Sequence, residues 1–208
     1  MEEKVTTIIF DLGGVLINWD PKVLYRKIFE TEAEVTTFLR EVATMDWNEQ
    51  QDGGRSLSDA TALLISQYPQ WTSEIEAYYT RWEEMLVGPI DGTVEILRQL
   101  KTEGNYRLLA LTNWSAETFP IAQKRYDFLE WFEGILVSGQ EKLKKPDPAI
   151  YQLILKRYKL KSEESIFIDD NLRNIEAARA LGIQSIHFAT PNRLIEQLSE
   201  VGVLLKSN

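Results

Sequence analysis

Five short apolar runs along the chain predict strands that are buried inside a sheet. Each run is continuous rather than alternating, which is the pattern of strands covered on both faces. The runs are Thr7–Phe10, Arg107–Leu111, Gly134–Val137, Ser165–Ile168 and Ser185–Phe188.

Patterns between the later runs predict helices. They cover Thr93–Lys101, Ala116–Tyr126, Pro148–Tyr158 and Leu172–Ala180. Ser115 is the expected N-cap of the second of these helices, and Gly182 follows the end of the last. Strands and helices that alternate in this way predict the α/β class, with a Rossmann-like parallel sheet as the core.

The segment from Pro21 to about Val87 interrupts this alternation, directly after the first strand and its turn. It has no strand pattern, and it indicates several helices with a break at Gly53–Gly54. Ligands of open α/β sheets bind at the carboxyl ends of the strands, so an insertion at that edge would cover the site. We therefore expect a core of residues 1–17 and 88–208 and a helical cap of residues 18–87, with Val87–Gly92 as the returning hinge.

Composition narrows the chemistry. The net charge of -9 and the lack of a Lys/Arg cluster argue against a nucleic-acid partner. The chain has no cysteine and one histidine, which excludes thiol chemistry and nearly excludes a Ser-His-Asp triad or a His-rich metal site. His187 is expected to be structural. A metal would need oxygen ligands, which favours a hard ion such as Mg²⁺.

The chain shows no pattern for entering a membrane. Its first ten residues are too polar and too short for a signal peptide, and no apolar run approaches the ~20 residues of a membrane span. We expect a cytoplasmic protein with no membrane partner.

Polar side chains follow four of the predicted strands at their carboxyl ends, where a parallel sheet brings them to one edge. They are Asp11, Thr112, Asn113, Lys144, Lys145, Asp169 and Asp170. The set suits phosphoryl transfer, with Asp11 as nucleophile and Mg²⁺ on Asp11 and the Asp169/Asp170 pair. Lys145 and Thr112 would hold phosphoryl oxygens, and the backbone N–H groups of Leu12, Gly13 and Gly14 would form an anion nest.

Four stretches carry a resemblance to a known family. "FDLGGVL", "LTNWS", "KKPDPAIY" and "FIDDNLRNIEAARALGI" resemble, in order, the motifs of the haloacid dehalogenase-like (HAD) hydrolase superfamily. The helical insertion lies where that family has its first type of cap. The resemblance is closer to the branch with bacterial sugar-phosphate phosphatases and the N-terminal phosphatase domain of soluble epoxide hydrolase. It implies a Mg²⁺-dependent phosphatase that acts on a small phosphorylated metabolite.

The resemblance also implies metal-binding roles. Asp11 would be the nucleophile and a Mg²⁺ ligand, with the backbone carbonyl of Gly13 as a second ligand. Asp170 would be the main acidic ligand of the last motif. Asp169 would orient Lys145 or help to hold the ion.

Further roles concern the phosphoryl group. Thr112 and Asn113 would bind it, and Lys145 would pair with it and with Asp11, with Lys144 as the competing assignment. Asn171 and Asn174 would fix the last loop or bound waters. In the cap, Trp47 is a tentative substrate contact, and Trp114 would line the pocket entrance or pack beneath the cap.

The chain departs from the family pattern at Gly13. Most phosphatases of the superfamily carry a second aspartate there, which serves as general acid and base, a contribution of ~10²–10⁴ in rate. One reading is a slower or selective phosphatase that uses water, a cap residue or a good leaving group instead. The branch resembled here also tolerates glycine at this position.

Two alternatives stay open. A metal-independent 2-haloacid dehalogenase would also use Asp11 and lack the second aspartate, but it tends to lose the acidic pair that Asp169 and Asp170 form here. Its carboxylate-holding arginine would be sought among Arg26, Arg40 and Arg55. The third reading is a non-catalytic phosphate-binding module.

Overall fold

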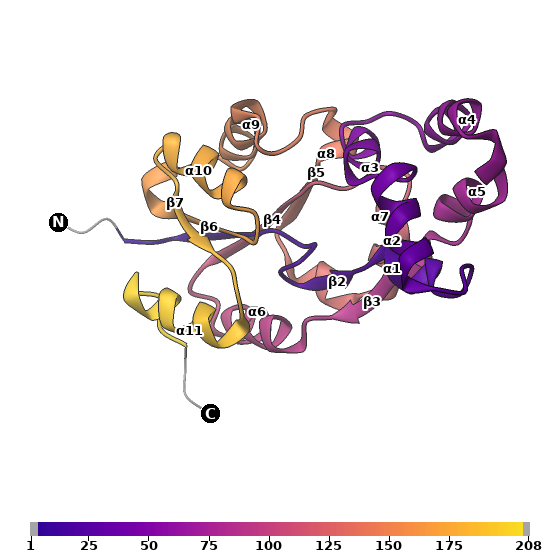
Figure 1. Cartoon of the computed structure of the whole chain (residues 1–208). Helices are drawn as coiled ribbons and strands as arrows, with labels where there is room; N and C mark the ends of the chain where they lie inside the picture. Colours follow the sequence, from indigo (N-terminus) through magenta and orange to yellow (C-terminus); the bar gives the residue numbers. More distant parts are fainter. Residues whose placement is uncertain (1–3, 206–208) are drawn as a thin grey trace.

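Strand β1 lies at the centre of a parallel sheet with the order β5-β4-β1-β6-β7 (Figure 1). The computed structural model describes residues 4–205, so residues 1–3 and 206–208 of the predicted core lie outside the described residues. The strands of this sheet are β1 (Thr7–Phe10), β4 (Arg107–Thr112), β5 (Gly134–Val137), β6 (Ser165–Asp169) and β7 (Gln184–His187). The predicted α/β class and parallel sheet are confirmed, and no strand end differs from its prediction by more than one residue.

Helices flank the sheet and fill the segment between β1 and β4. They are α1 (Pro21–Tyr25), α2 (Glu32–Glu41), α3 (Met45–Asp52), α4 (Leu57–Gln67), α5 (Thr72–Thr80), α6 (Asp91–Glu103), α7 (Phe119–Arg125), α8 (Ser138–Glu141), α9 (Pro148–Tyr158), α10 (Leu172–Ala180) and α11 (Pro191–Glu200). Short 3₁₀ turns cover Pro69–Trp71, Trp82–Met85, Asp127–Trp131 and Ser162–Glu164. Helices α9 and α10 have the predicted bounds.

The predicted start of α7 is wrong. The helix begins at Phe119 rather than Ala116, and the Ser115 hydroxyl accepts from the Glu117 N–H without capping a helix. The backbone before it is held elsewhere, because the Trp114 N–H donates to Ser138 Oγ and the Gly139 N–H donates to the Trp114 carbonyl. These bonds tie the segment to the end of β5, so helical geometry starts only one turn later.

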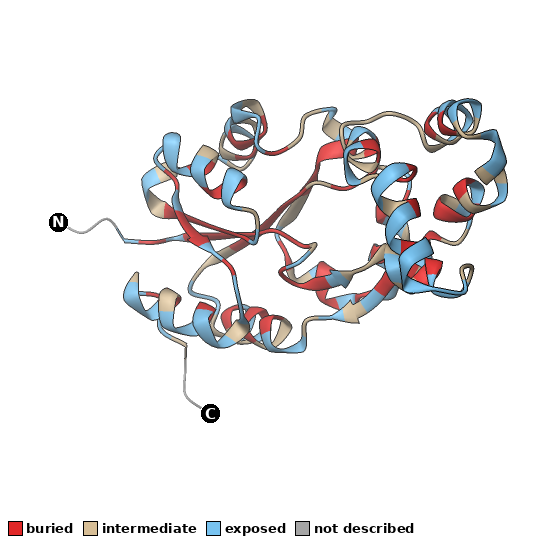
Figure 2. Cartoon of the chain, viewed as in Figure 1, coloured by how far each residue is buried: buried red, intermediate tan, exposed pale blue. Residues whose placement is uncertain are grey.

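Alternate side chains of β1 point into two apolar layers. Ile8 and Phe10 pack into the layer that includes helices α6 and α11, whereas Ile9 packs into the layer of α9 and α10. Figure 1 shows these helix pairs on opposite faces, and Figure 2 shows the strands buried between them. Burial on both faces explains the continuous apolar runs and leaves the strand ends as the place for polar side chains.

Residues 18–87, called here the cap segment, carry α1 to α5. The expectation that this region has no strand is wrong at its ends, because β2 (Ile17–Trp19) pairs antiparallel with β3 (Leu86–Pro89). This ribbon forms both connections between the cap segment and the sheet, and it includes half of the expected Val87–Gly92 hinge. Two strands of three and four residues with a glycine and a proline give no recognisable pattern. The division into core and cap domains stays a prediction.

Candidate active site

Asp11 stands at the end of the central strand, where the backbone turns. Its N–H donates to the Ile168 carbonyl at 2.8 Å, which continues the pairing of β1 with β6 for one more residue. Its Oδ1 accepts from the Leu12 N–H at 2.7 Å. The side chain is 10% exposed. The sheet therefore holds one carboxylate in a fixed orientation at its edge.

Lys145 reaches the same point from the loop before α9. Its buried ammonium lies 2.9 Å from Asp11 Oδ1 and 2.7 Å from Asp169 Oδ2. The side chain of Asn113 binds both backbone groups of Lys145, donating to its carbonyl at 2.9 Å and accepting from its N–H at 2.8 Å. Lys144 points away and pairs with Glu49 of the cap segment at 2.9 Å. Asn113 thus positions the lysine that faces Asp11.

Asp169 and Asp170 are adjacent in sequence but differ in their surroundings. Asp169 is fully buried, and its oxygens accept from Lys145, from the Asn171 N–H at 2.8 Å and from Asn174 Nδ2 at 3.0 Å. Asp170 is exposed, and its side chain lies against the backbone of Gly14, where an added Cβ would sit 2.2 Å from Oδ2. Residue 14 therefore has to be glycine for two reasons: a Cβ would clash with Asp170, and the backbone has a positive φ of 73°.

Asp170 also has a link to the last strand, because His187 Nε2 lies 2.9 Å from its backbone carbonyl. The His187 side chain thus contacts the loop of the last motif without joining the carboxylates.

The carboxylates of Asp11, Asp169 and Asp170 form one group whose potential ligand atoms lie within 4.8 Å of one another. All three offer oxygen, which matches a hard divalent cation such as Mg²⁺. Because the oxygens of Asp169 already accept several hydrogen bonds, Asp11 and Asp170 are the carboxylates best placed to face an ion.

Burial perturbs the acid–base behaviour of this group. Desolvation raises the pKa of Asp11 to about 8, although Lys145 acts in the opposite direction. Burial by itself lowers the pKa of Lys145, but the Asp11 and Asp169 carboxylates outweigh it and raise that pKa above its ordinary value. Desolvation and the neighbouring Asp169 raise the pKa of Asp170. A cation among these carboxylates would favour their charged forms.

Thr112, at the end of β4, has a buried hydroxyl with no hydrogen-bond partner among the described residues. A buried polar group without a partner costs free energy, so a hydroxyl left open at a site edge indicates a ligand. Two of the three N–H groups of the predicted anion nest, those of Leu12 and Gly14, already donate to groups of the protein. Leu12 donates to Asp11, and Gly14 donates to the Ile17 carbonyl at 3.0 Å, because the turn bonds to itself.

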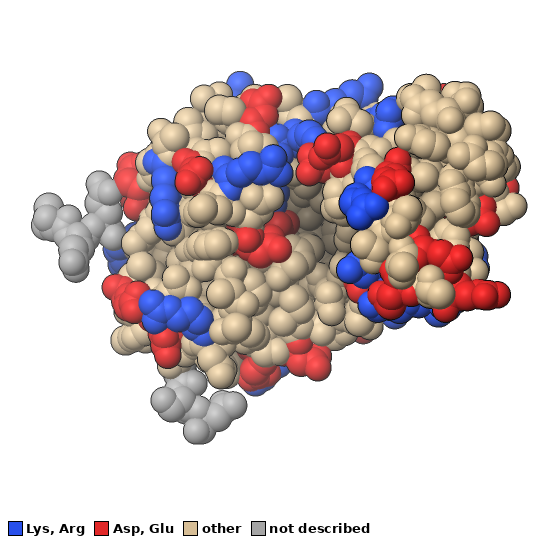
Figure 3. Space-filling view, viewed as in Figure 1, with Lys and Arg blue, Asp and Glu red and all other residues tan. Residues whose placement is uncertain are grey.

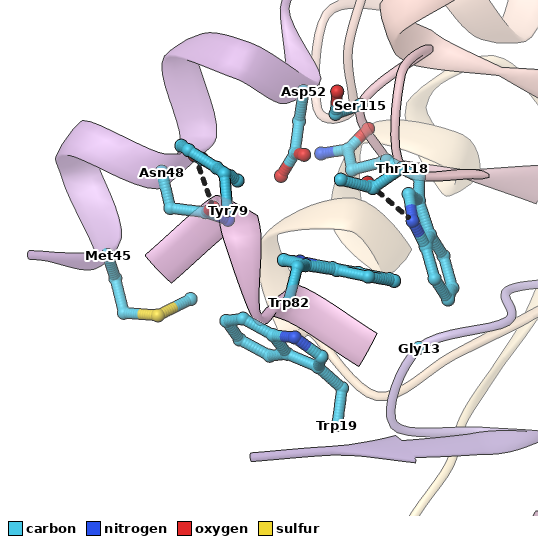
Figure 4. A pocket seen from close by; sticks show the side chains of 11 residues that line it. Gly13, Trp19, Met45, Asn48, Asp52, Tyr79, Trp82, Ser115 and Thr118 are labelled. Carbon is cyan, nitrogen blue, oxygen red and sulfur yellow. Dashed lines mark hydrogen bonds between the residues drawn. The ribbon is translucent and has the colours of Figure 1, made fainter. Parts of the chain in front are cut away.

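A cavity of ≈ 160 Å³, called here the aromatic pocket, opens beside Gly13 between the core and the cap segment. Figure 3 shows a hollow between these two parts of the molecule, and Figure 4 shows the residues that line the pocket. They are Gly13, Trp19, Met45, Asn48, Asp52, Tyr79, Trp82, Asn113, Trp114, Ser115 and Thr118.

The two tryptophans singled out from the sequence lie in different places. Trp114 lines the pocket and packs against Trp82, with ring centroids 5.6 Å apart. Trp47, the tentative substrate contact, is not among the residues that line the pocket. Its ring packs edge-on against Tyr78 and its Nε1–H donates to the Ala60 carbonyl, because it belongs to the core of the cap segment.

Asp52 is one of the pocket residues that the sequence analysis did not single out. It is the last residue of α3, and its carboxylate points into the pocket (Figure 4). The available signal was an acidic residue directly before the Gly53–Gly54 break, which has the composition of an ordinary solvated turn.

Comparisons with known proteins show the family to which the chain belongs. Residues 5–182 match the model of the haloacid dehalogenase-like hydrolases, so the chain belongs to this hydrolase family. The Sesquiterpene phosphatase astK of Aspergillus oryzae is 33% identical over 86% of this chain and 87% of its own length. The Phosphorylated carbohydrates phosphatase of Thermotoga maritima is 26% identical, over 86% of this chain and 83% of its own.

A solved structure shares the fold. It is a HAD family enzyme of Bacteroides thetaiotaomicron in complex with magnesium and inorganic phosphate, with a TM-score of 0.68 and 23% identity, covering 89% of this chain and 95% of its own. Within the described residues of the present chain, no helix has the length and apolar character needed to cross a membrane.

Proposed function

We propose that the protein is a Mg²⁺-dependent phosphatase that hydrolyses a small phosphomonoester through an aspartyl-phosphate on Asp11. The observation that carries this proposal is the buried Lys145 ammonium in contact with Asp11 and Asp169, together with a Thr112 hydroxyl that has no hydrogen-bond partner among the described residues. A fixed carboxylate, a fixed cation and an open donor together match the needs of phosphoryl transfer.

Each residue has a part in that reaction. Asp11 Oδ1 already accepts from Lys145 and Leu12, which leaves Oδ2 as the oxygen for attack on phosphorus. Lys145 and the Thr112 hydroxyl hold phosphoryl oxygens, and Asn113 keeps Lys145 in place through its backbone. Asp169 orients the ammonium. Restricting these groups to one geometry lowers the cost of reaching the transition state.

Asp11, Asp170 and the Gly13 carbonyl would hold Mg²⁺, with Asp169 as a close neighbour. When bound, the ion supplies charge neutralisation between the carboxylates and the incoming phosphate. The Bacteroides enzyme of the same fold, seen with magnesium and phosphate, is consistent with this assignment.

The aromatic pocket indicates the kind of group that the phosphate carries. Three tryptophans, Trp19, Trp82 and Trp114, are among the residues that line it. Several polar atoms there are already used, because Trp114 Nε1–H donates to Thr118 and the Tyr79 hydroxyl donates to Asn48. The Asp52 carboxylate and the Trp19 indole N–H, which has no hydrogen-bond partner among the described residues, are left for a polar substrate group, whereas an apolar group would gain from contact with the ring faces.

Apolar phosphates and sugar phosphates are both represented among the relatives. One relative is a sesquiterpene phosphatase, and another is a phosphatase of phosphorylated carbohydrates. The pocket walls favour an apolar organic phosphate over the sugar phosphate expected from sequence.

The dehalogenase alternative receives less support. None of the three candidate arginines is among the described residues that line the pocket. Arg26 pairs with Glu32, and Arg40 pairs with Glu41. Arg55 donates to the Gln51 side chain and to the Trp47 carbonyl. The acidic pair that a metal-independent dehalogenase does not need is intact.

The experiment is a parallel screen of the purified protein with Mg²⁺ and with EDTA. One arm measures phosphate release from isoprenoid, aryl and sugar monophosphates, and the other measures chloride release from 2-chloropropionate. Mg²⁺-dependent phosphate release, fastest on the apolar esters, is the expected result. Metal-independent chloride release would overturn the proposal.

A further inference from the structure

The reaction proposed above lacks a proton donor for the leaving oxygen, because Gly13 has no side chain. A Cβ built at Gly13 meets no atom within 4 Å, so the space beside the nucleophile is open rather than filled by another side chain of the described chain. Gly13 is one wall of the aromatic pocket, so a donor has to reach this space from another wall.

Asp52 is the only carboxylic acid among the described residues that line the pocket. It reaches the pocket from the carboxyl end of α3, on the side that faces Ser115 (Figure 4). The Tyr79 and Asn48 side chains bond to each other, and the Thr118 hydroxyl accepts from Trp114. Asp52 therefore remains as the pocket group that can both give and take a proton.

The backbone of Asp52 is anchored to the strand ends that carry the site. Ser138 Oγ, at the end of β5, donates to the Asp52 carbonyl at 2.6 Å and accepts from the Trp114 N–H at 2.9 Å. One serine hydroxyl thus joins the last residue of α3 to the residue that follows Thr112 and Asn113.

A second link fixes the same helix. Glu49, one turn before Asp52 in α3, pairs with Lys144 at 2.9 Å, and Lys144 is the neighbour of the site lysine. Asp52 is therefore held against the core at two points, although it belongs to the cap segment.

We infer that Asp52 is the general acid and base of this phosphatase and takes the role that Gly13 cannot fill. Asp11 Oδ2 bonds to phosphorus while the bond to the ester oxygen breaks, and Asp52 gives its proton to that oxygen. Asp52, now a carboxylate, then takes a proton from the water that attacks the phosphoenzyme, and the Asp11 carboxylate is released with inorganic phosphate. The inference rests on the proposed function.

The surroundings of Asp52 suit both steps. Desolvation raises the pKa of Asp52 to about 7, with Lys144 acting against it, so both protonation states are available near neutral pH. The charged and titratable groups that face it are Lys144 and Lys145 from the loop before α9, Glu49 from its own helix, and Tyr78 and Tyr79 from α5.

The test compares the leaving-group dependence of wild type and Asp52→Asn. An alkyl phosphate needs a proton on its leaving oxygen, whereas p-nitrophenyl phosphate does not. We expect kcat/KM of the variant to fall by roughly 10²–10⁴-fold on the alkyl ester and far less on the aryl ester. Asp46→Asn, on the exposed side of the same helix, is the matched control and should change neither value.

The double variant Gly13→Asp/Asp52→Asn separates a catalytic role from a structural one. The open space at residue 13 accepts the new side chain, so activity on the alkyl ester should recover by at least ~10-fold over Asp52→Asn. An active wild type whose Asp52→Asn variant loses both substrates equally, or neither, would overturn the inference and leave the proposed function standing. A wild type that releases no phosphate would instead overturn the proposed function.

Discussion

The ammonium of Lys145 lies 2.9 Å from the carboxylate of Asp11, and both side chains are almost completely removed from solvent. The Asp169 carboxylate also contacts this ammonium, at 2.7 Å. One buried cation therefore compensates two buried carboxylates. This contact joins the end of the central strand to a loop 134 residues later, and it decides how the site responds to mutation.

Removing the cation should destabilise the protein strongly. In Lys145→Met, Asp11 and Asp169 lose their common partner, and breaking a buried pair in this way costs about 3–5 kcal/mol. Lys144→Met is the control, because its pair with Glu49 is about a third exposed and is worth ~0–1 kcal/mol. Urea unfolding of the metal-free proteins measures both. Equal losses in the two variants would contradict the assignment of Lys145 as the site lysine.

Thr112→Val should separate ligand binding from stability. The hydroxyl has no partner among the described residues, so its loss should leave the free energy of unfolding unchanged or slightly higher. A hydrogen bond to a charged phosphoryl oxygen is worth ~1.5–3 kcal/mol, so inorganic phosphate should inhibit the variant roughly 10-fold or more weakly.

Thr118→Val is the opposite case, because it leaves the Trp114 indole N–H without its acceptor. It should lower stability by about 1–3 kcal/mol. A Thr112→Val variant that is destabilised and still binds phosphate normally would show that its hydroxyl serves the fold.

The raised pKa of Asp52 in the cap segment makes the stability of the folded protein depend on pH. The folded protein keeps Asp52 protonated up to a pKa of about 7, whereas the unfolded chain loses that proton near 3.8. The folded state therefore binds the extra proton between these values, and its stability falls as pH rises through this window.

Asp52→Asn removes that dependence, because the amide stays neutral. At about pH 8 the free energy of unfolding of the variant should exceed that of wild type by at most about 4 kcal/mol, so the variant should unfold at a higher temperature. The two proteins should have the same stability at about pH 4. Thermal unfolding across this range measures the effect without any substrate. Parallel curves for the two proteins would show that the Asp52 carboxyl is not perturbed.

Much of the core could be predicted because its signals are local. Continuous apolar runs follow from burial on both faces of the sheet, and a parallel sheet then brings Asp11, Thr112 and Asp169 to one edge whatever the loops do. The sequence did not decide which lysine faces Asp11, because Lys144 and Lys145 are neighbours with the same side chain. Their difference depends on how Asn113 holds the loop backbone.

The remaining features depend on distant contacts. Strands β2 and β3 are too short to leave a pattern, and they form only because the two connections of the cap segment meet. Trp47 looked available for a substrate, but its ring is buried against Tyr78. Asp52 has the sequence surroundings of a turn residue, and its place in the pocket wall depends on distant contacts such as the bond from Ser138 to its carbonyl.

The most direct test of the central claim compares phosphate release by wild type and Asp11→Asn, each with saturating Mg²⁺ and an aryl phosphate. Lys145 keeps its contact with Asp169 at 2.7 Å when Asp11 becomes an amide, so the variant should still fold, and thermal unfolding of both proteins checks this. We expect phosphate release to fall by roughly 10⁴-fold or more, since the attacking oxygen is lost. A folded Asp11→Asn variant that turns over at a rate close to wild type would contradict the phosphoenzyme on Asp11.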